Sequence, residues 1–157
     1  MPSMLLDYDP LLLQVALFIL LNYDKGIDIP ITISTGSMLI AGHLVSPIEY
    51  YQGLAAEQKQ GSPMHLLFAQ KAEEAQQQAK EIREEYDKKG NNEFNPLDKP
   101  ILHFLYMRDA HFLLSAAFAF PLTSDEGFWW RCRLNTVTGF MWTALITKDA
   151  TAEVTQF

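Results

Sequence analysis

The first third of the chain carries two different patterns of hydrophobic residues. Residues 11–21 are apolar at almost every position, which predicts a helix over about 10–23 that is either buried or covered by a partner. Asp9 and Pro10 directly precede this run, and both residue types are common at the start of a helix. Isoleucine then occupies every second position of 27–33, which is the period of a half-buried strand.

A second strand is expected after the turn at 34–37. It is predicted over 38–45 and contains Gly42, and a glycine inside a strand is typical of a sharp bend or a close approach of two backbones. The sequence Ser-Pro-Ile-Glu at 46–49 has the form of a capping box, in which the serine and glutamate side chains satisfy the first N–H groups of a helix. We therefore expect a helix from 46 to about 60, directly after the second strand.

A longer helix, predicted over about 63–89, has a thin apolar face. Its apolar residues are spaced as in a coiled-coil seam and are Phe68, Ala72, Ala75, Ala79, Ile82 and Tyr86. Two interpretations stay open: a solvated helical arm, or a helix that pairs with another helix of the same chain or of a neighbour. Because alanine side chains offer little apolar area, we expect 63–90 to be an arm rather than part of the core.

The C-terminal part of the chain returns to the patterns of strands. Residues 101–109 are typical of a strand that is buried on both faces. The apolar run 110–120 fits either a strand or an extended loop, and its periodicity does not decide between them. Two further strands are predicted over 128–134 and 140–147, whereas 148–157 is expected to be a loose tail.

These elements form one predicted domain over 1–157, because this length matches the usual size of a single domain. The predicted fold class is α+β, with a small, strongly bent, five-stranded antiparallel sheet or an open barrel. The order of helix and strands resembles the Sm-like small barrel, as an analogy of fold alone. The predicted segments are the N-terminal helix at 9–24, the hairpin at 27–45, the helical insertion at 46–92 between strands 2 and 3, the strands at 101–147 and the tail at 148–157.

Composition limits the classes of function. The chain has 12 Lys and Arg residues against 19 Asp and Glu residues, and this net charge of −7 disfavours binding to nucleic acid. The apolar run at 11–21 is shorter than the ~20 residues that span a bilayer. No Lys or Arg precedes Lys25, although a secretory signal would require one. We therefore expect a cytoplasmic protein without a membrane span.

No residue pattern indicates catalysis, a metal site or a bound cofactor. His103, Asp109 and His111 are the most suggestive group, but their spacing matches no metal or catalytic motif, and ordinary strand histidines are the simpler interpretation. The sequence also lacks a nucleophile elbow and a glycine-rich phosphate loop. Cys132 is predicted to be a buried, inert thiol, since strand alternation places it on the face opposite its two arginine neighbours.

The densest cluster of large side chains is Phe-Trp-Trp-Arg-Cys-Arg-Leu at 128–134. Aromatic and basic residues that alternate on a strand can bind single-stranded nucleic acid by stacking. They can also form a core strand or a protein interface, in which arginine stems pack over tryptophan. The acidic net charge favours the second interpretation.

Three segments carry a further set of motifs. They are Ile-Thr-Ile-Ser-Thr-Gly-Ser-Met-Leu-Ile-Ala-Gly-His-Leu, Leu-Tyr-Met-Arg-Asp-Ala-His-Phe and Trp-Trp-Arg-Cys-Arg-Leu-Asn-Thr-Val-Thr-Gly-Phe. Together, over about 25–54 and 101–142, they resemble the gas vesicle accessory protein U (GvpU) family. The residues that carry the resemblance are Gly36, Leu39, Ile40, Gly42, Leu44, Asp109, Ala110, Trp130, Arg131, Arg133, Leu134, Gly139 and Phe140. Cys132 stands where the family pattern is expected to have glycine.

The resemblance implies a non-enzymatic accessory protein that influences the assembly or clustering of gas vesicles through protein contacts. The implied partners are the vesicle shell and other gas vesicle proteins. Further copies of the chain are also expected, because a helix this apolar favours a homo-oligomer. Expected contact residues on the first helix, the aromatic strands and the seam are Leu13, Leu17, Leu20, Trp129, Trp142, Ala72, Ala79, Ile82 and Tyr86.

Two alternatives to an accessory protein stay open. A ring-forming RNA-binding module would place the arginines at 108, 131 and 133 on a basic rim. A small enzyme would have to assemble His103, Asp109 and His111 into one site. The acidic charge and the absence of a known constellation make both less favoured than the accessory protein.

Overall fold

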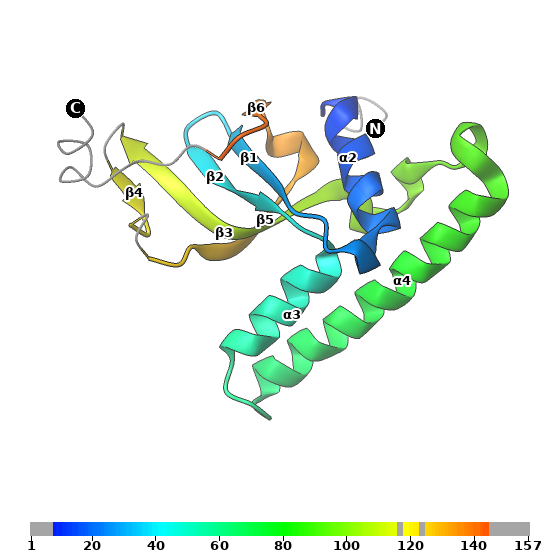
Figure 1. Cartoon of the computed structure of the whole chain (residues 1–157), viewed down its shortest axis with the longest axis horizontal. Helices are drawn as coiled ribbons and strands as arrows, with labels where there is room; N and C mark the ends of the chain where they lie inside the picture. Colours follow the sequence, from blue (N-terminus) through cyan, green and yellow to red (C-terminus); the bar gives the residue numbers. More distant parts are fainter. Residues whose placement is uncertain (1–7, 116–117, 123–124, 145–157) are drawn as a thin grey trace.

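A computed structural model describes residues 8–115, 118–122 and 125–144 of the chain. The helices are α2 (Pro10–Leu21), α3 (Pro47–Glu57) and α4 (Pro63–Glu93), and the strands are β1 (Ile29–Ser34), β2 (Leu39–Leu44), β3 (Phe104–Ser115), β4 (Phe118–Phe120), β5 (Phe128–Arg133) and β6 (Gly139–Met141) (Figure 1). Short 3₁₀ turns are η1 (Tyr23–Lys25), η2 (Pro96–Asp98), η3 (Pro100–His103) and η4 (Leu134–Thr136). The predicted α+β class is confirmed, with α3 and α4 inserted between β2 and β3.

The strands form one open antiparallel sheet in the order β4-β3-β2-β1-β6, and β5 also pairs with β3. Because β2 occupies one edge of β3, both β5 and β4 lie on its other edge. There, β5 runs beside the first half of β3 and β4 beside the second half. The sheet has six strands rather than the predicted five, because the undecided run 110–120 extends β3 to Ser115 and supplies β4. The last predicted strand, 140–147, is described as a strand only to Met141, and the predicted tail at 148–157 lies outside the described residues.

Gly42 marks a close approach of two backbones, as its place inside a strand predicted. Ala41 pairs with His111 but His43 pairs with Arg108, so β3 carries a bulge opposite the glycine. A Cβ atom on Gly42 would lie 2.9 Å from the methyl of Met107 and 3.1 Å from Cα of the bulge residue Ala110. Only a residue without a side chain fits this position comfortably.

Side-chain caps begin the helices at the predicted positions. The carboxylate of Asp9 accepts a hydrogen bond from the N–H of Leu11 at 2.8 Å, and the hydroxyl of Ser46 accepts one from the N–H of Glu49 at 3.1 Å. The return bond of the predicted capping box is replaced by another contact, because the Glu49 carboxylate lies 3.7 Å from Nε of Arg108. The helix after Ser46 ends at Glu57, three residues before the predicted end.

The core lies between the sheet and the inner faces of α2 and α4. Leu12 and Leu20 of α2 are fully buried against Ile31 and Ile33 of β1 and the middle of β3. Helix α2 is therefore a core helix along one side. Its other side leaves Leu11 and Phe18 exposed.

The interpretation of α4 as an arm is wrong. Helix α4 packs along α3 as a helical hairpin, and its C-terminal half also contacts α2 (Figure 1). Ala75, Ala79 and Ile82 belong to the main hydrophobic core. Small alanine side chains let the helix backbone lie close to its neighbours, so a thin seam can still be a core face.

Candidate interaction surfaces

The predicted contact residues of α2 face inward. Leu13 and Leu20 are buried in the core, and Leu17 is half-buried against it. The seam residues of α4 show the same behaviour: Ala72, Ala79 and Ile82 are buried, and the ring of Tyr86 packs on Phe94 at 5.5 Å. These side chains are occupied within the chain, so they do not form an exposed contact surface.

The two predicted tryptophan contacts differ from each other. Trp142 follows β6, is 43% exposed and packs edge-on against Phe140 at 5.1 Å. Trp129 is half-buried on the other side of the sheet, against Tyr50 of α3 at 6.4 Å. Of the predicted contact residues, Trp142 is the one that the structure leaves clearly open to a partner.

The structure does not assemble His103, Asp109 and His111 into one site. His103 contacts the carbonyl of Leu97 through Nε2 at 2.8 Å, at the start of β3. His111 lies on the far side of the β3 bulge, where its Nε2 contacts the carbonyl of Asp125 at 3.1 Å. Within the described residues no group of three or more His, Cys, Asp or Glu side chains could hold a metal ion.

Asp109 and His111 hold a loop in place. Asp109 adopts a left-handed backbone conformation at the bulge, with φ of 54°, and its carboxylate accepts a hydrogen bond from the N–H of Gly127 at 2.7 Å. A Cβ atom on Gly127 would lie 2.5 Å from the carbonyl carbon of Asp109, so the two backbones touch. These contacts fix the start of β5 on β3 and account for both side chains without catalysis.

Cys132 lies on the core-facing side of β5, as strand alternation predicted, but it is partly rather than fully buried. Arg131 and Arg133 point to the opposite face and are exposed. Burial raises the pKa of the Cys132 thiol to about 11, with a smaller opposing effect from Thr136. A thiol with this pKa stays protonated near neutral pH, which makes it a poor nucleophile.

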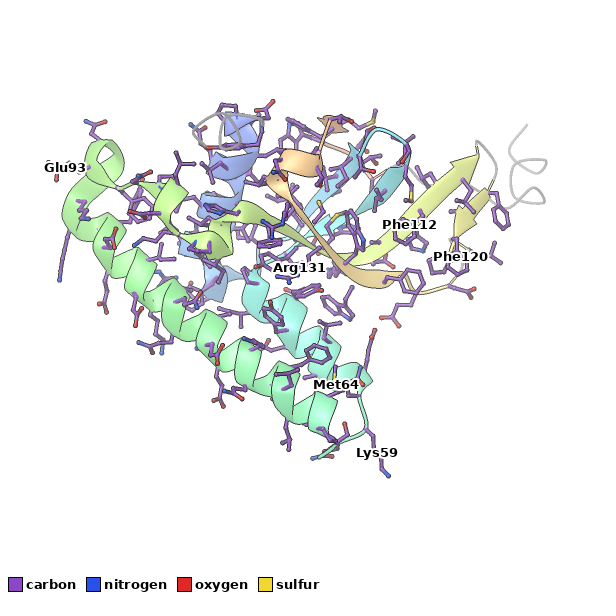
Figure 2. The ribbon with its side chains drawn as sticks, turned by 180° about the vertical axis from the view of Figure 1, so that it is seen from behind. Lys59, Met64, Glu93, Phe112, Phe120 and Arg131 are labelled. Atoms are coloured by element: carbon purple, nitrogen blue, oxygen red, sulfur yellow. The ribbon has the colours of Figure 1, made fainter. Side chains whose placement is uncertain are left out.

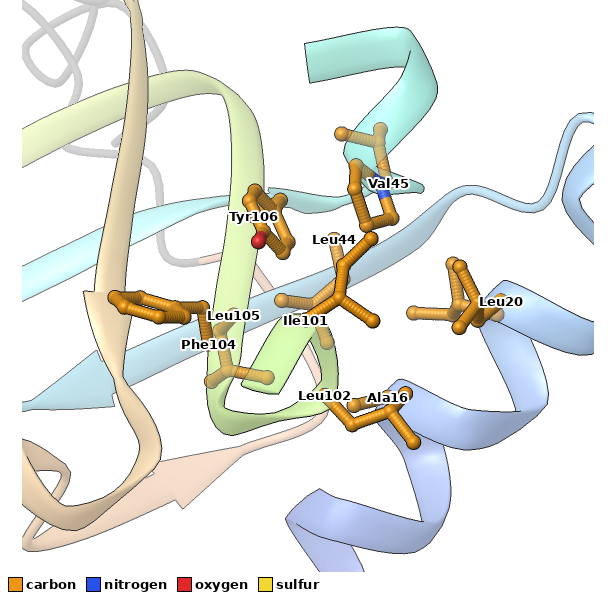
Figure 3. Close-up of a pocket in the computed structure, with 11 residues that line it drawn as sticks. Ala16, Leu20, Leu44, Val45, Ile101, Leu102, Phe104, Leu105 and Tyr106 are labelled. Atoms are coloured by element: carbon orange, nitrogen blue, oxygen red, sulfur yellow. The ribbon is translucent and has the colours of Figure 1, made fainter. Parts of the chain in front are cut away.

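The space between α2 and the segment formed by η3 and the start of β3 is a packing gap. It is lined by Ala16 and Leu20 of α2, Leu44 and Val45 at the end of β2, and the segment 101–106 (Figure 3). Its volume of about 10 Å³ is at the lower limit for one water molecule, and its walls are mostly apolar. This gap has no room for a ligand.

An apolar surface that no other described segment covers lies at the far end of the sheet. We call it the open apolar end, and its residues are Leu114, Phe118, Phe120, Leu122 and Phe128. Each of these side chains is at least 40% exposed, and Leu114 reaches 60%. Figure 2 shows Phe112 and Phe120 at the end of the sheet that lies away from α4.

The open apolar end continues the core outward. Phe112 pairs with the buried Ile40 on β2 and with Phe120 on β4, so these side chains share the core-facing side of the sheet. The ring of Phe112 lies 6.0 Å from the rings of Phe128 and Trp130. Among the described residues, the helices cover this face only over the first half of β3. The apolar run 110–120 was visible in the sequence, but its pattern fitted both a strand and a loop and so did not predict this surface.

A second aromatic group covers the opposite face of the sheet. Tyr106 of β3 is buried between Tyr50 of α3 and Phe104, with ring distances of 5.3 and 6.2 Å. Burial raises the pKa of Tyr106 to about 12, so its hydroxyl stays neutral. A Cβ atom on Gly53 would lie 2.1 Å from the Trp129 ring, so this glycine lets α3 lie directly on the strand.

The arginines on this face have different surroundings. Arg108 is paired with Asp28 and approaches Glu49 at 3.7 Å, and the hydrogen bond to Asp28 raises its pKa further. Arg131 and Arg133 instead place their guanidinium groups over the ring of Phe104, at 4.4 and 5.3 Å. The basic rim expected for an RNA-binding module is therefore interrupted, because the carboxylates of Asp28 and Glu49 compensate the charge of Arg108.

Comparison with known proteins gives one finding. The sequence model of a family described as "Gas vesicle protein GvpU-like" matches residues 12–145. Searches of curated proteins and of solved structures gave no match. No helix in the described part of the chain is long and apolar enough to cross a membrane.

Proposed function

Because the chain belongs to the GvpU-like family of gas vesicle proteins, we propose that it is a non-enzymatic accessory protein that binds the vesicle shell or another gas vesicle protein. The observation that supports this role is the open apolar end. Exposed aromatic clusters of this kind are typical of protein-binding surfaces, since their burial supplies most of the binding free energy.

The proposed action on vesicles is assembly or clustering. A homo-oligomer presents several copies of the open apolar end, and several weak contacts together hold two particles more firmly than one contact does. The outward residues of α2, Leu11 and Phe18, are the proposed contact between copies, because both are exposed on a helix that is otherwise apolar. The protein is then cytoplasmic and associated with vesicles.

A flotation experiment tests the proposed role. Purified gas vesicles rise during centrifugation, and a protein that binds them rises with them. The variant Leu114→Gln places a polar group in the open apolar end, and we expect it to reduce the floated fraction several-fold. Leu66→Gln is the matched control, because Leu66 of α4 is also 60% exposed and lies outside that surface.

The outcomes separate the proposal from its competitors. Loss of flotation with Leu114→Gln but not with Leu66→Gln supports binding through the open apolar end. Equal flotation of both variants and the unchanged protein excludes this surface. Absence of flotation for the unchanged protein, with every vesicle protein present, excludes direct binding to vesicles.

A further inference from the structure

A groove on the outer face of the sheet lies apart from the open apolar end. It runs between α4 and the strands β3 and β5, and it has a volume of about 180 Å³. The floor is apolar and includes Ala75, Ile101 and Phe104, and Arg131 and Tyr51 form part of one wall. This volume is several times the ~30 Å³ occupied by one water molecule, so the groove has room for a side chain.

Of the charged residues that line the groove, Lys71 is paired with Glu74 at 3.3 Å, whereas Arg131 has no carboxylate partner among the described residues. Within the described ranges, neither Arg131 nor Arg133 has a carboxylate oxygen within 4.0 Å, although the chain carries an excess of acidic residues. Arg131 donates a hydrogen bond from Nη1 to the hydroxyl of Tyr51, at 3.4 Å. Two guanidinium groups near one ring repel each other, and an anion beside them would relieve that repulsion.

A second arginine–aromatic pair in the same chain includes a carboxylate partner and so serves as a comparison for Arg131. Arg83 lies 4.3 Å from the centre of the Tyr23 ring, almost the same distance as Arg131 from Phe104. Arg83 also binds the Asp24 carboxylate at 2.7 Å, so that pair is complete within the chain. Arg131 lies at a similar distance from its ring, but no carboxylate oxygen of the described residues lies within 4.0 Å of it.

We propose that the groove binds an acidic peptide segment of a partner protein, with the partner's carboxylate on Arg131 and an adjacent aromatic or aliphatic side chain on the apolar floor. A planar guanidinium can form two parallel hydrogen bonds to a carboxylate, and the ring beneath it holds it in position. A polyphosphate fits less well, because Lys71 on the other wall is already paired with Glu74 at 3.3 Å, which leaves Arg131 alone for the ligand, and because the whole chain is acidic. This inference does not depend on the proposed binding to vesicles.

The test is a titration with a defined peptide. The probe is the blocked tetrapeptide acetyl-Ser-Glu-Phe-Glu-amide, and its matched control has glutamine in place of both glutamates. Neither peptide contains tryptophan, so intrinsic fluorescence reports the protein, in which Trp129 packs beside Tyr50. We expect the acidic peptide to bind at least about tenfold more tightly than the glutamine peptide, and less tightly as salt rises.

Variants of the protein locate the binding. Arg131→Gln is expected to weaken binding of the acidic peptide by about tenfold and to leave the glutamine peptide unaffected. Arg83→Gln is the matched control, because it removes an arginine with the same ring geometry outside the groove and should leave the affinity unchanged. Circular dichroism spectra that match the unchanged protein verify that each variant is folded.

Several outcomes would overturn the proposal. These are equal binding of the two peptides, undiminished binding by Arg131→Gln, or competition by inorganic phosphate that is stronger than competition by acetate at equal ionic strength. Self-association of the protein that is lost in Arg131→Gln would assign the groove to a second copy instead. A higher peptide affinity after Asp149→Asn and Glu153→Gln would assign it to the chain's own C-terminal segment.

Discussion

The two halves of strand β3 are equally apolar in sequence but have opposite environments. In the first half, Leu105 and Met107 are at most 2% exposed, beneath α2 and the turn η3. In the second half, Phe112 is partly exposed and Leu114 is 60% exposed. The difference arises from the helices, which cover one half and leave the other open.

The two halves of β3 are therefore expected to contribute differently, the first half to the stability of the fold and the second half to binding. Residues under the helices lose their contact with water when the chain folds, and that transfer stabilises the fold. Residues of the open apolar end stay 40–60% exposed, so the burial of that surface remains available to a partner. We therefore expect substitutions in the first half of β3 to affect folding, and substitutions in the second half to affect binding.

Removal of the covering helix should have the largest effect. Replacing 63–92 with a short Gly/Ser linker exposes the core surfaces that Ala75, Ala79 and Ile82 now cover. We expect the variant to be unfolded, with loss of the near-UV dichroism of its tryptophans. Native-like near-UV dichroism would show that α4 is dispensable, as the sequence analysis expected.

The same truncation in each half of β3 provides a direct comparison. Leu105→Ala should lower the free energy of unfolding by about 3 kcal/mol, because it leaves a cavity in the core. Leu114→Ala should lower it by less than about 0.5 kcal/mol, because the side chain is mostly hydrated already. Urea denaturation measures both values, and similar losses for the two variants would contradict the division of β3.

The bulge between the two halves should be sensitive to added volume. Gly42→Val is expected to destabilise the protein by about 2 kcal/mol, since the new side chain meets Met107 and the backbone of Ala110. His43→Val is the control; it removes a partly exposed contact with Asp28 and should cost less than about 1 kcal/mol. Equal thermal unfolding midpoints for the two variants would show that the bulge tolerates a side chain.

The smallest expected effect concerns Cys132 beneath the covered half. Its folded-state pKa of about 11 exceeds the ordinary value of 9.0, so the unfolded chain releases the thiol proton first as the pH rises. The protonated Cys132 thiol therefore contributes fully to the free energy of unfolding below pH 9, and this contribution is lost between pH 9 and about 11. In the Cys132→Ser variant, the free energy of unfolding should therefore fall less over this pH range. In the native protein, the thiol should react slowly with a disulfide reagent at pH 8, and rapid reaction would contradict its burial.

Local signals predicted most of the elements. The alternating isoleucines correctly indicated β1, and the Asp9 and Ser46 caps correctly indicated where α2 and α3 begin. Gly42 indicated a close backbone approach, which the structure explains by the bulge of β3. These signals succeed because caps, alternation and close glycine contacts depend mainly on neighbours in the sequence or on the adjacent strand.

The predicted contact residues illustrate what a sequence pattern leaves open. Leu13, Leu20 and Ile82 were expected to meet a partner, and each is buried within the chain. Burial of an apolar side chain is favourable, but the local sequence does not indicate whether the same chain or another molecule provides the contact. The exposed phenylalanines of β4 were missed because a three-residue strand has too little periodicity to be recognised.

The sequence by itself determined the α+β class, the order of the main elements, the resemblance to GvpU and the neutral, inward position of Cys132. Tertiary structure alone decided that α4 belongs to the core, that Arg108 has carboxylate partners and that Arg131 has none within the described residues. Local structure follows from side chains a few residues apart. Whether an apolar face is buried or available for binding depends on which distant segments of the chain pack against that face. Short-range sequence patterns do not contain that information.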